Sequence, residues 1–238
     1  MDKPEKIKEP EGKLGVLIPG MGAVATTFIA GVEAIKAGLG EPVGSLTQMG
    51  TIRPGKRTDD RSPLIKDFVD LAALDDLVFG GWDVFEDDCY EAATHAGVLK
   101  QETLDTLRQP LAAIKPWKAI FDRNYVRRLE GPHVKAGSNK WDLAQMVRED
   151  INSFKARHGL ERLVMIWCGS TEIFMEPNPV HDSIEAFEKG LRENSPAIAP
   201  SMIYAYAALQ EGIPYLNGAP NLTVDMPVMG ELARQGGA

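Results

Sequence analysis

Leu14-Gly15-Val16-Leu17-Ile18 runs directly into Gly20-Met21-Gly22-Ala23-Val24-Ala25, and this stretch decides the fold class. The apolar run predicts a buried strand and residues 26–39 predict a helix, so a glycine turn joins the two. In a dinucleotide-binding turn the first glycine makes the tight bend. The second lets the backbone approach a pyrophosphate, and the third position must be small, here Ala25. The helix N-terminus would offer free N–H groups to a diphosphate. An ordinary strand-to-helix turn explains the same residues, so the motif alone leaves both interpretations open.

The composition of the 238-residue chain is that of a globular protein, with 44% hydrophobic and 25% charged residues. The net charge of −8 argues against nucleic acid or an anionic membrane as the main partner, since both select basic faces. Residues 1–13 lack the apolar segment of a signal peptide, and no later stretch has the length of a membrane span. Cys89 and Cys168 are too few for a disulfide framework, so we expect a cytoplasmic protein.

Apolar segments alternate along the chain with amphipathic ones. Strands are expected at 14–18, 43–47, 77–79, 119–121, 163–168 and 213–216. Helices are expected at 26–39, 87–95, 98–116, 141–158, 182–194 and 201–211. Strands separated by helices indicate right-handed βαβ units and therefore a parallel α/β sheet. The apolar run 163–168 predicts a strand buried on both faces, whereas residues 50–63 are polar and predict a surface loop.

Asp83 follows the second well-defined strand, in Gly80-Gly81-Trp82-Asp83. In a nucleotide-binding sheet, a carboxylate at the tip of the second strand accepts hydrogen bonds from ribose hydroxyls. Asp83 stands about sixty residues after the glycine turn instead of ~20, so this role requires a long insertion at about 40–76. The alternative is that Asp83 caps a helix starting near Phe85.

Further polar residues follow two other expected strands. Ser170-Thr171 comes after the buried run and Asn217-Gly218 after the last strand, where ligands bind in open α/β sheets. Helix capping and ordinary turn chemistry explain them as well. The four histidines share no metal-ligand spacing, and the basic group Arg123, Arg127, Arg128 and Lys135 is expected to be a solvated loop. Cys168 is expected to be a core thiol.

One absence bears on catalysis. From residue 195 to residue 238 the single cation is Arg234, whereas polarising a substrate oxygen requires a placed positive group. We therefore assign no catalytic residue.

Taken together and in this order, these segments resemble the myo-inositol-1-phosphate synthase family, also called inositol-3-phosphate synthase. The glycine turn is shorter than the G-x-G-G-N-N-G form of eukaryotic members and is similar to a bacterial branch. The resemblance covers nearly the whole chain after residue 12. It is carried by residues 14–16 and 20–27, Gly44-Ser45-Leu46-Thr47-Gln48, residues 80–83 with Tyr90-Glu91-Ala92, Trp167 with Ser170-Thr171-Glu172, Ala199-Pro200-Ser201, residues 211–215, Asn217-Gly218 and Pro220.

This resemblance implies a Rossmann-like, doubly wound, mostly parallel sheet that is incomplete at its C-terminus. It implies an NAD-binding domain at 13–238, with the insertion at about 40–76, behind a flexible tail at 1–12. The family converts D-glucose 6-phosphate to 1D-myo-inositol 3-phosphate by oxidation, enolisation, intramolecular aldol closure and reduction, as a homotetramer. The cofactor-binding residues it implies are Gly20, Met21, Gly22, Ala23, Val24, Ala25, Trp82, Asp83, Ser170, Thr171, Asn217 and Gly218.

The family pattern continues past position 238 with lysine-containing segments and a tetramer-forming catalytic region. We therefore expect this chain on its own to lack turnover. Two alternatives remain: another NAD-dependent oxidoreductase, and a non-catalytic module that binds nucleotide or only a partner subunit.

Overall fold

The computed structural model describes residues 11–238, so the tail expected at 1–12 lies almost wholly outside the described residues. Five strands form one sheet in the order β3-β2-β1-β4-β5, and every neighbouring pair is parallel. The strands are β1 (Leu14–Pro19), β2 (Leu77–Asp83), β3 (Trp117–Lys118), β4 (Arg162–Trp167) and β5 (Tyr215–Asn217). The predicted parallel α/β fold is confirmed, and the strand order changes direction between β1 and β4.

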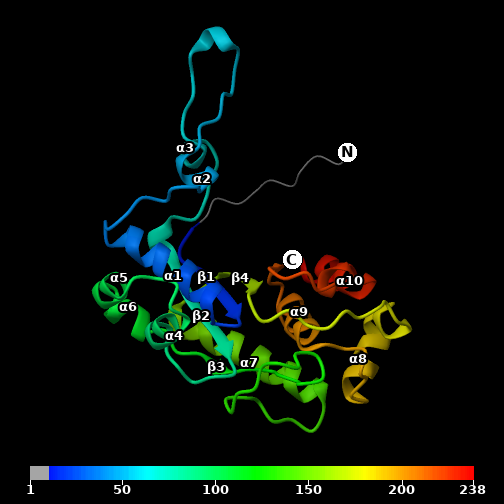
Figure 1. Cartoon of the computed structure of the whole chain (residues 1–238). Coiled ribbons are helices and arrows are strands. Elements are labelled where there is room, and N and C mark those ends of the chain that lie inside the picture. The colour runs from blue at the N-terminus through cyan, green and yellow to red at the C-terminus, as the bar shows by residue number, and fades with distance from the viewer. Residues whose placement is uncertain (1–10) are drawn as a thin grey trace.

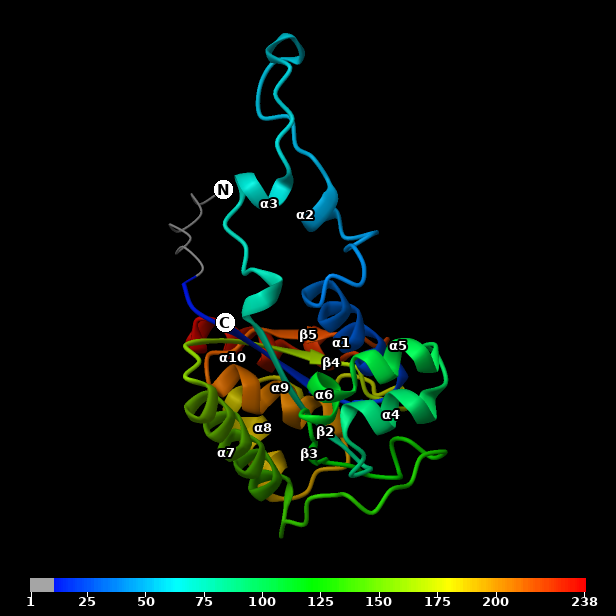
Figure 2. The ribbon, with the colours of Figure 1, turned by 90° about the vertical axis from the view of Figure 1, so that its left-hand side faces the viewer.

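Helices cover both faces of the sheet (Figure 2). The α-helices are α1 (Ala23–Lys36), α2 (Leu46–Met49), α3 (Ile65–Phe68), α4 (Cys89–Ala96), α5 (Gln101–Thr106), α6 (Arg108–Ala112), α7 (Lys140–His158), α8 (Ile184–Arg192), α9 (Pro200–Gln210) and α10 (Pro227–Gly236). Short 3₁₀ helices are η1 (Arg57–Asp59), η2 (Leu74–Asp76), η3 (Pro179–His181) and η4 (Thr223–Asp225). No helix within the described residues has both the length and the apolarity needed to span a bilayer.

The central strand β1 divides the core into two layers, because successive side chains of a strand point to opposite faces. Val16 and Ile18 pack with α1, α4, α5 and α6, whereas Leu17 packs with α7, α8, α9 and α10. Strand β4 does the same: Met165 belongs to the second layer, and Val164 packs against the first. Helices therefore cover both faces of β4, but burial is complete on one face alone: Leu163, Met165 and Trp167 are buried, whereas Val164 and Ile166 are half-buried.

Residues 40–76 leave the body as a long arm (Figure 1). No residue of α2, η1 or α3 is buried. The two sides of the arm are joined by an antiparallel bridge between Thr51 and Leu64, and the Ile65 amide donates to the Gly50 carbonyl at 2.9 Å. The predicted surface loop at 50–63 is confirmed, with one 3₁₀ turn inside it.

Several elements differ from the sequence prediction. Helix α10 was not expected, and the strand expected at 119–121 lies earlier, as the two residues of β3, with only an isolated bridge at Ala119. The strand expected at 43–47 is wrong: no neighbouring strand is within reach, and residues 46–49 close a helical turn in which the Met49 amide donates to the Ser45 carbonyl. The single helix expected at 98–116 is two short helices, α5 and α6, which meet at Leu107. Pro110 in α6 has no N–H to donate to the preceding turn, which explains why the helix does not run through.

Candidate functional site

The turn between β1 and α1 is shaped by two glycines with different surroundings. Gly20 has φ +89°, and a Cβ there would lie 2.3 Å from the Cα of Gly169, the second residue after β4. Only glycine fits at this contact. Gly22 is the N-cap of α1, and a Cβ added there would meet no atom within 4 Å. Neither a side-chain cap nor an acidic residue occupies the first turn of α1, so its N–H groups face a space that suits an anion.

Asp83 is the last residue of β2 and contacts this turn directly. Its Oδ2 accepts a 2.7 Å hydrogen bond from the Met21 amide, and its Oδ1 accepts one of 3.1 Å from the Phe85 amide. The helix that follows is capped by Asp88, whose Oδ1 accepts from the Tyr90 amide, so the alternative of Asp83 as helix cap is wrong. Burial raises the pKa of Asp83, and these backbone hydrogen bonds partly offset the rise. A carboxylate has about four acceptor positions, so Asp83 retains capacity for hydroxyl donors.

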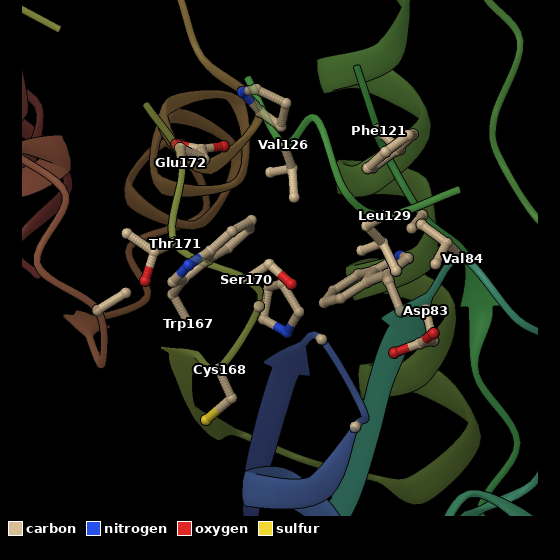
Figure 3. A pocket seen from close by; sticks show the side chains of 18 of the residues that line it. Asp83, Val84, Phe121, Val126, Leu129, Trp167, Cys168, Ser170, Thr171 and Glu172 are labelled. Atoms are coloured by element: carbon tan, nitrogen blue, oxygen red, sulfur yellow. The ribbon is translucent and has the colours of Figure 1, made fainter. Parts of the chain in front are cut away.

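A cavity of about 490 Å³ opens at the carboxyl ends of the strands, between Asp83 on one side and Trp167 and Thr171 on the other (Figure 3). It lies where the strand order changes direction, which is where ligands bind in open α/β sheets. Nine of the sequence-predicted residues line it: Gly20, Gly22, Ala23, Val24, Trp82, Asp83, Ser170, Thr171 and Gly218.

The remaining three predicted residues lie beside this cavity. Met21 lines a smaller adjoining cavity that also includes Asp83 and His95. Ala25 is fully buried under the turn, where the motif requires a small residue. Asn217 lines neither cavity, and its side-chain amide donates to the Asn221 carbonyl at 2.6 Å.

Trp82 forms a wall of the cavity and has no free polar atom. Its indole is fully buried, and its Nε1 donates to Asp150 Oδ2 at 2.6 Å. The same oxygen lies 2.6 Å from Lys135 Nζ, whose side chain is only 7% exposed. The expectation that Lys135 belongs to a solvated loop is therefore wrong, because it forms a buried ion pair that holds the Trp82 indole in place.

Sequence reasoning missed further cavity residues at the ends of the strands and in the segments that follow them. They are Pro19, Val84, Phe85, Ala119, Ile120, Phe121, Val126, Leu129, Trp167, Cys168, Gly169, Glu172, Pro200, Tyr204, Ala219 and Pro220. Cys168 is half-buried at the cavity wall instead of in the core, and burial raises the pKa of its thiol. Trp167 Nε1 is a buried donor with no partner among the described residues. An open backbone cradle and an unpaired donor both suit a ligand that carries acceptor groups. The described lining residues include no lysine, arginine or histidine.

Comparison with known proteins gives consistent results. The model of the NAD-binding domain described as myo-inositol-1-phosphate synthase matches residues 14–238. The chain is 46% identical over 233 residues to inositol-3-phosphate synthase 1 of Bacteroides thetaiotaomicron, covering 97% of this chain and 54% of that protein. It is 29% identical over 257 residues to inositol-3-phosphate synthase of Saccharomyces cerevisiae, covering 97% and 48%.

Solved structures agree with the sequence matches. The crystal structure of inositol-3-phosphate synthase from Caenorhabditis elegans superposes with a TM-score of 0.87 at 27% identity, covering 95% of this chain and 48% of that one. A myo-inositol-1-phosphate synthase-related protein from Thermotoga maritima, at 18% identity and a TM-score of 0.62, shares the fold. The chain spans about half the length of the curated relatives it matches.

Proposed function

The chain belongs to the myo-inositol-1-phosphate synthase family, whose matched domain binds NAD, and on this premise we propose that residues 13–238 bind NAD across the glycine turn. One observation carries the proposal: the Asp83 carboxylate, the Met21 amide and the open face of Gly22 meet at one end of a cavity. Such an arrangement supplies both an anion cradle and an acceptor for ribose hydroxyls.

Each part of the nucleotide has matching residues. Residues 20–25 and the N-terminus of α1 would hold the pyrophosphate, and Asp83 the adenosine ribose. Ser170 and Thr171 beyond β4, and Gly218 beyond β5, would border the nicotinamide side, while Asn217 at the end of β5 would act indirectly by holding the loop at Asn221. Trp82 would supply an apolar wall. Bound there, NAD would supply a hydride acceptor and later a hydride donor.

The proposed whole reaction is the one that the family resemblance implies, the conversion of D-glucose 6-phosphate to 1D-myo-inositol 3-phosphate, and the relatives are named for its product. The described cavity lining contains no lysine, arginine or histidine that could polarise the carbonyl during ring closure or bind the substrate phosphate. We therefore propose that this chain supplies the NAD-binding half of the site. Alone, it would bind the cofactor without converting the sugar phosphate. The same lack of a lysine or histidine argues against a self-sufficient dehydrogenase.

The proposed localisation, oligomeric state and partners follow from the same family. We propose a cytoplasmic protein that assembles as a homo-oligomer, a tetramer in the full-length form, without nucleic acid or membrane as a partner. The net charge of −8 and the two free cysteines support this setting.

Calorimetric titration of residues 1–238 with NAD tests the proposal. We expect saturable binding with one site per chain, and no inositol phosphate when glucose 6-phosphate is added with NAD. A folded chain that gives no binding signal with NAD overturns the nucleotide-binding proposal. Formation of inositol phosphate would instead overturn the proposed lack of turnover.

A further inference from the structure

Glu172 is a buried carboxylate at the cavity wall that the proposed cofactor contacts do not use. It is 6% exposed and lies five residues after the end of β4, near the start of α9 (Figure 3). Its Oε1 accepts a 2.9 Å hydrogen bond from the Ser201 amide, and its Oε2 accepts one from the Ser201 hydroxyl. That hydroxyl lies 2.7 Å from the hydroxyl of Thr223. Burying a carboxylate is costly unless hydrogen-bond donors surround it, so a buried carboxylate with several donors indicates a structural role.

The same residue also pairs with the loop after β5. The Glu172 amide donates to Asn221 Oδ1 at 3.1 Å, and Asn221 Nδ2 donates back to Glu172 Oε2 at 3.3 Å. Nearer the sheet, the Gly218 amide donates to the Trp167 carbonyl at 3.0 Å. Beyond that contact, the hydrogen bonds between loops 168–172 and 217–223 within the described structure are the two made by Glu172 and Asn221.

The two loops that Glu172 joins both line the cavity. Ser170 and Thr171 come from the first loop, and Gly218 and Ala219 from the second. Both lie on the β4–β5 side, whereas Asp83 and the glycine turn lie on the β2–β1 side. The first loop meets the glycine turn through backbone atoms, where Gly169 packs on Gly20. A change at Glu172, three residues further along, is therefore expected to act mainly on the β4–β5 half of the cavity.

The position of Glu172 explains how the fold tolerates a buried charge. Pro200 is the first residue of α9 and has no N–H, so the Ser201 amide is the first donor of that helix. A carboxylate there satisfies this donor and lies at the positive end of the helix dipole. Lys140 adds a favourable charge from the far side, where its Nζ binds the carbonyls of Ser195 and Ile198.

We propose that Glu172 is a positioning residue: it ties loops 168–172 and 217–223 to the start of α9 and so sets the shape of the nicotinamide side of the cavity. This inference rests on the proposed function, since it assumes that the nicotinamide half of NAD lies on the β4–β5 side. It predicts that substituting Glu172 lowers the affinity for NAD and leaves unchanged the affinity for a ligand that lacks the nicotinamide ring.

The test compares Glu172→Gln with the unsubstituted chain by calorimetric titration with NAD and with ADP-ribose. We expect NAD affinity to fall about tenfold, which corresponds to about 1.4 kcal/mol, while ADP-ribose affinity stays within about twofold. The emission of bound NADH, which reports the surroundings of the reduced nicotinamide, should shift towards that of free NADH. The matched control is Glu193→Gln, because that glutamate is exposed at the end of α8. It should change none of these readouts.

A second variant keeps the inference testable if Glu172→Gln does not fold. Asn221→Ala removes the pairing between the loops and leaves the Ser201 contacts in place. Losing these two hydrogen bonds should weaken NAD binding at least about threefold and leave ADP-ribose binding unchanged. Equal losses for the two ligands, or unchanged NAD affinity in both variants, would overturn the positioning role. An unsubstituted chain that binds neither ligand would overturn the proposed function, and that result is distinct from binding without a difference between ligands.

Discussion

The Asp83 carboxylate lies 2.7 Å from the backbone nitrogen of Met21, although 62 positions separate the two residues in the chain. Adjacent parallel strands bring them together, because β1 and β2 pair in a register that sets Ile18 beside Gly81 and Pro19 beside Trp82. A Cβ at Gly81 would lie 2.2 Å from the Ile18 carbonyl oxygen, so this close approach needs glycine. The strand ends therefore fix the turn and the carboxylate as one unit.

Replacing Asp83 with asparagine should weaken nucleotide binding on the adenosine side. Asparagine can keep one of the two backbone contacts, but its NH₂ group faces the other backbone donor and its charge is lost. Losing charge-assisted hydrogen bonds of this kind costs about 1.5–3 kcal/mol, so NAD and ADP-ribose affinity should both fall at least about tenfold. Calorimetric titration measures both, with the exposed Asp75→Asn in the arm as control. Unchanged ADP-ribose affinity would contradict the assigned role.

The two glycines of the turn should respond to substitution in opposite ways. Gly20→Ala places a methyl group 2.3 Å from the Gly169 backbone at φ +89°, so the free energy of unfolding should fall by at least about 2 kcal/mol. Gly22→Val places its side chain in open space, so the fold should tolerate it while the pyrophosphate cradle is obstructed. Urea unfolding and NAD titration on both variants check the pair. A Gly22→Val chain that binds NAD normally would place the pyrophosphate elsewhere.

The local pattern around the first strand predicted what the structure contains there. Apolar residues, a glycine turn and an amphipathic helix are signals encoded within about 25 neighbouring positions, and β1 and α1 are both present. Helix α1 begins at Ala23 instead of Thr26 because Gly22 itself adopts the extended N-cap conformation. The apolar run near Val43 gave a wrong strand, since strand formation depends on a partner strand that the sequence does not reveal.

The site was predictable only where residues follow strands that the sequence marks clearly. Asp83 and Ser170 were found in this way. Phe121 and Leu129 were missed because β3 is two residues long, so the loop beyond it could not be placed at the cavity. Glu172 belonged to the family pattern without a role, because its partners Ser201 and Asn221 are 29 and 49 positions away.

The buried pair behind Trp82 gives a stability prediction. Asp150→Ala leaves Lys135 buried without its partner and removes the acceptor of the Trp82 indole. Breaking a buried ion pair by removing one partner costs about 3–5 kcal/mol, whereas replacing the whole pair with apolar residues is often close to neutral. Urea unfolding should therefore find the double variant Lys135→Met/Asp150→Leu more stable than Asp150→Ala. A double variant less stable than the single one would contradict this account.

The buried carboxylate of Glu172 should make stability depend on pH. Burial raises the pKa of Glu172 above its ordinary value of 4.5, although hydrogen bonds from Ser201 oppose the rise. The folded chain then binds this proton more tightly than the unfolded chain does. Its contribution to stability is present in full below the ordinary pKa and declines as the pH rises through the raised one. The free energy of unfolding, relative to Glu172→Gln, should therefore fall as the pH rises above the ordinary pKa of 4.5. Urea unfolding of both chains measures the difference, and a difference that grows with pH would contradict the direction.

An acidic residue in the first turn of α1 should raise stability and lower cofactor affinity at the same time. Val24 is 67% exposed, occupies the second position of the helix and lines the cavity, and the natural first turn contains no acidic side chain. Val24→Asp places a negative charge at the positive end of the helix, which typically stabilises by about 0.3–1 kcal/mol. The same charge would face the proposed pyrophosphate site, so NAD affinity should fall at least about tenfold at low salt and recover partly as salt screens the repulsion.

Val24→Asn is the uncharged control, with a side chain nearly equal in shape to that of aspartate. The melting temperature measures stability, and NAD titration measures affinity. A first turn without an acidic side chain fits a helix end that is open to an anionic ligand. If Val24→Asp bound NAD as tightly as Val24→Asn at low salt, no diphosphate would lie at this end of α1.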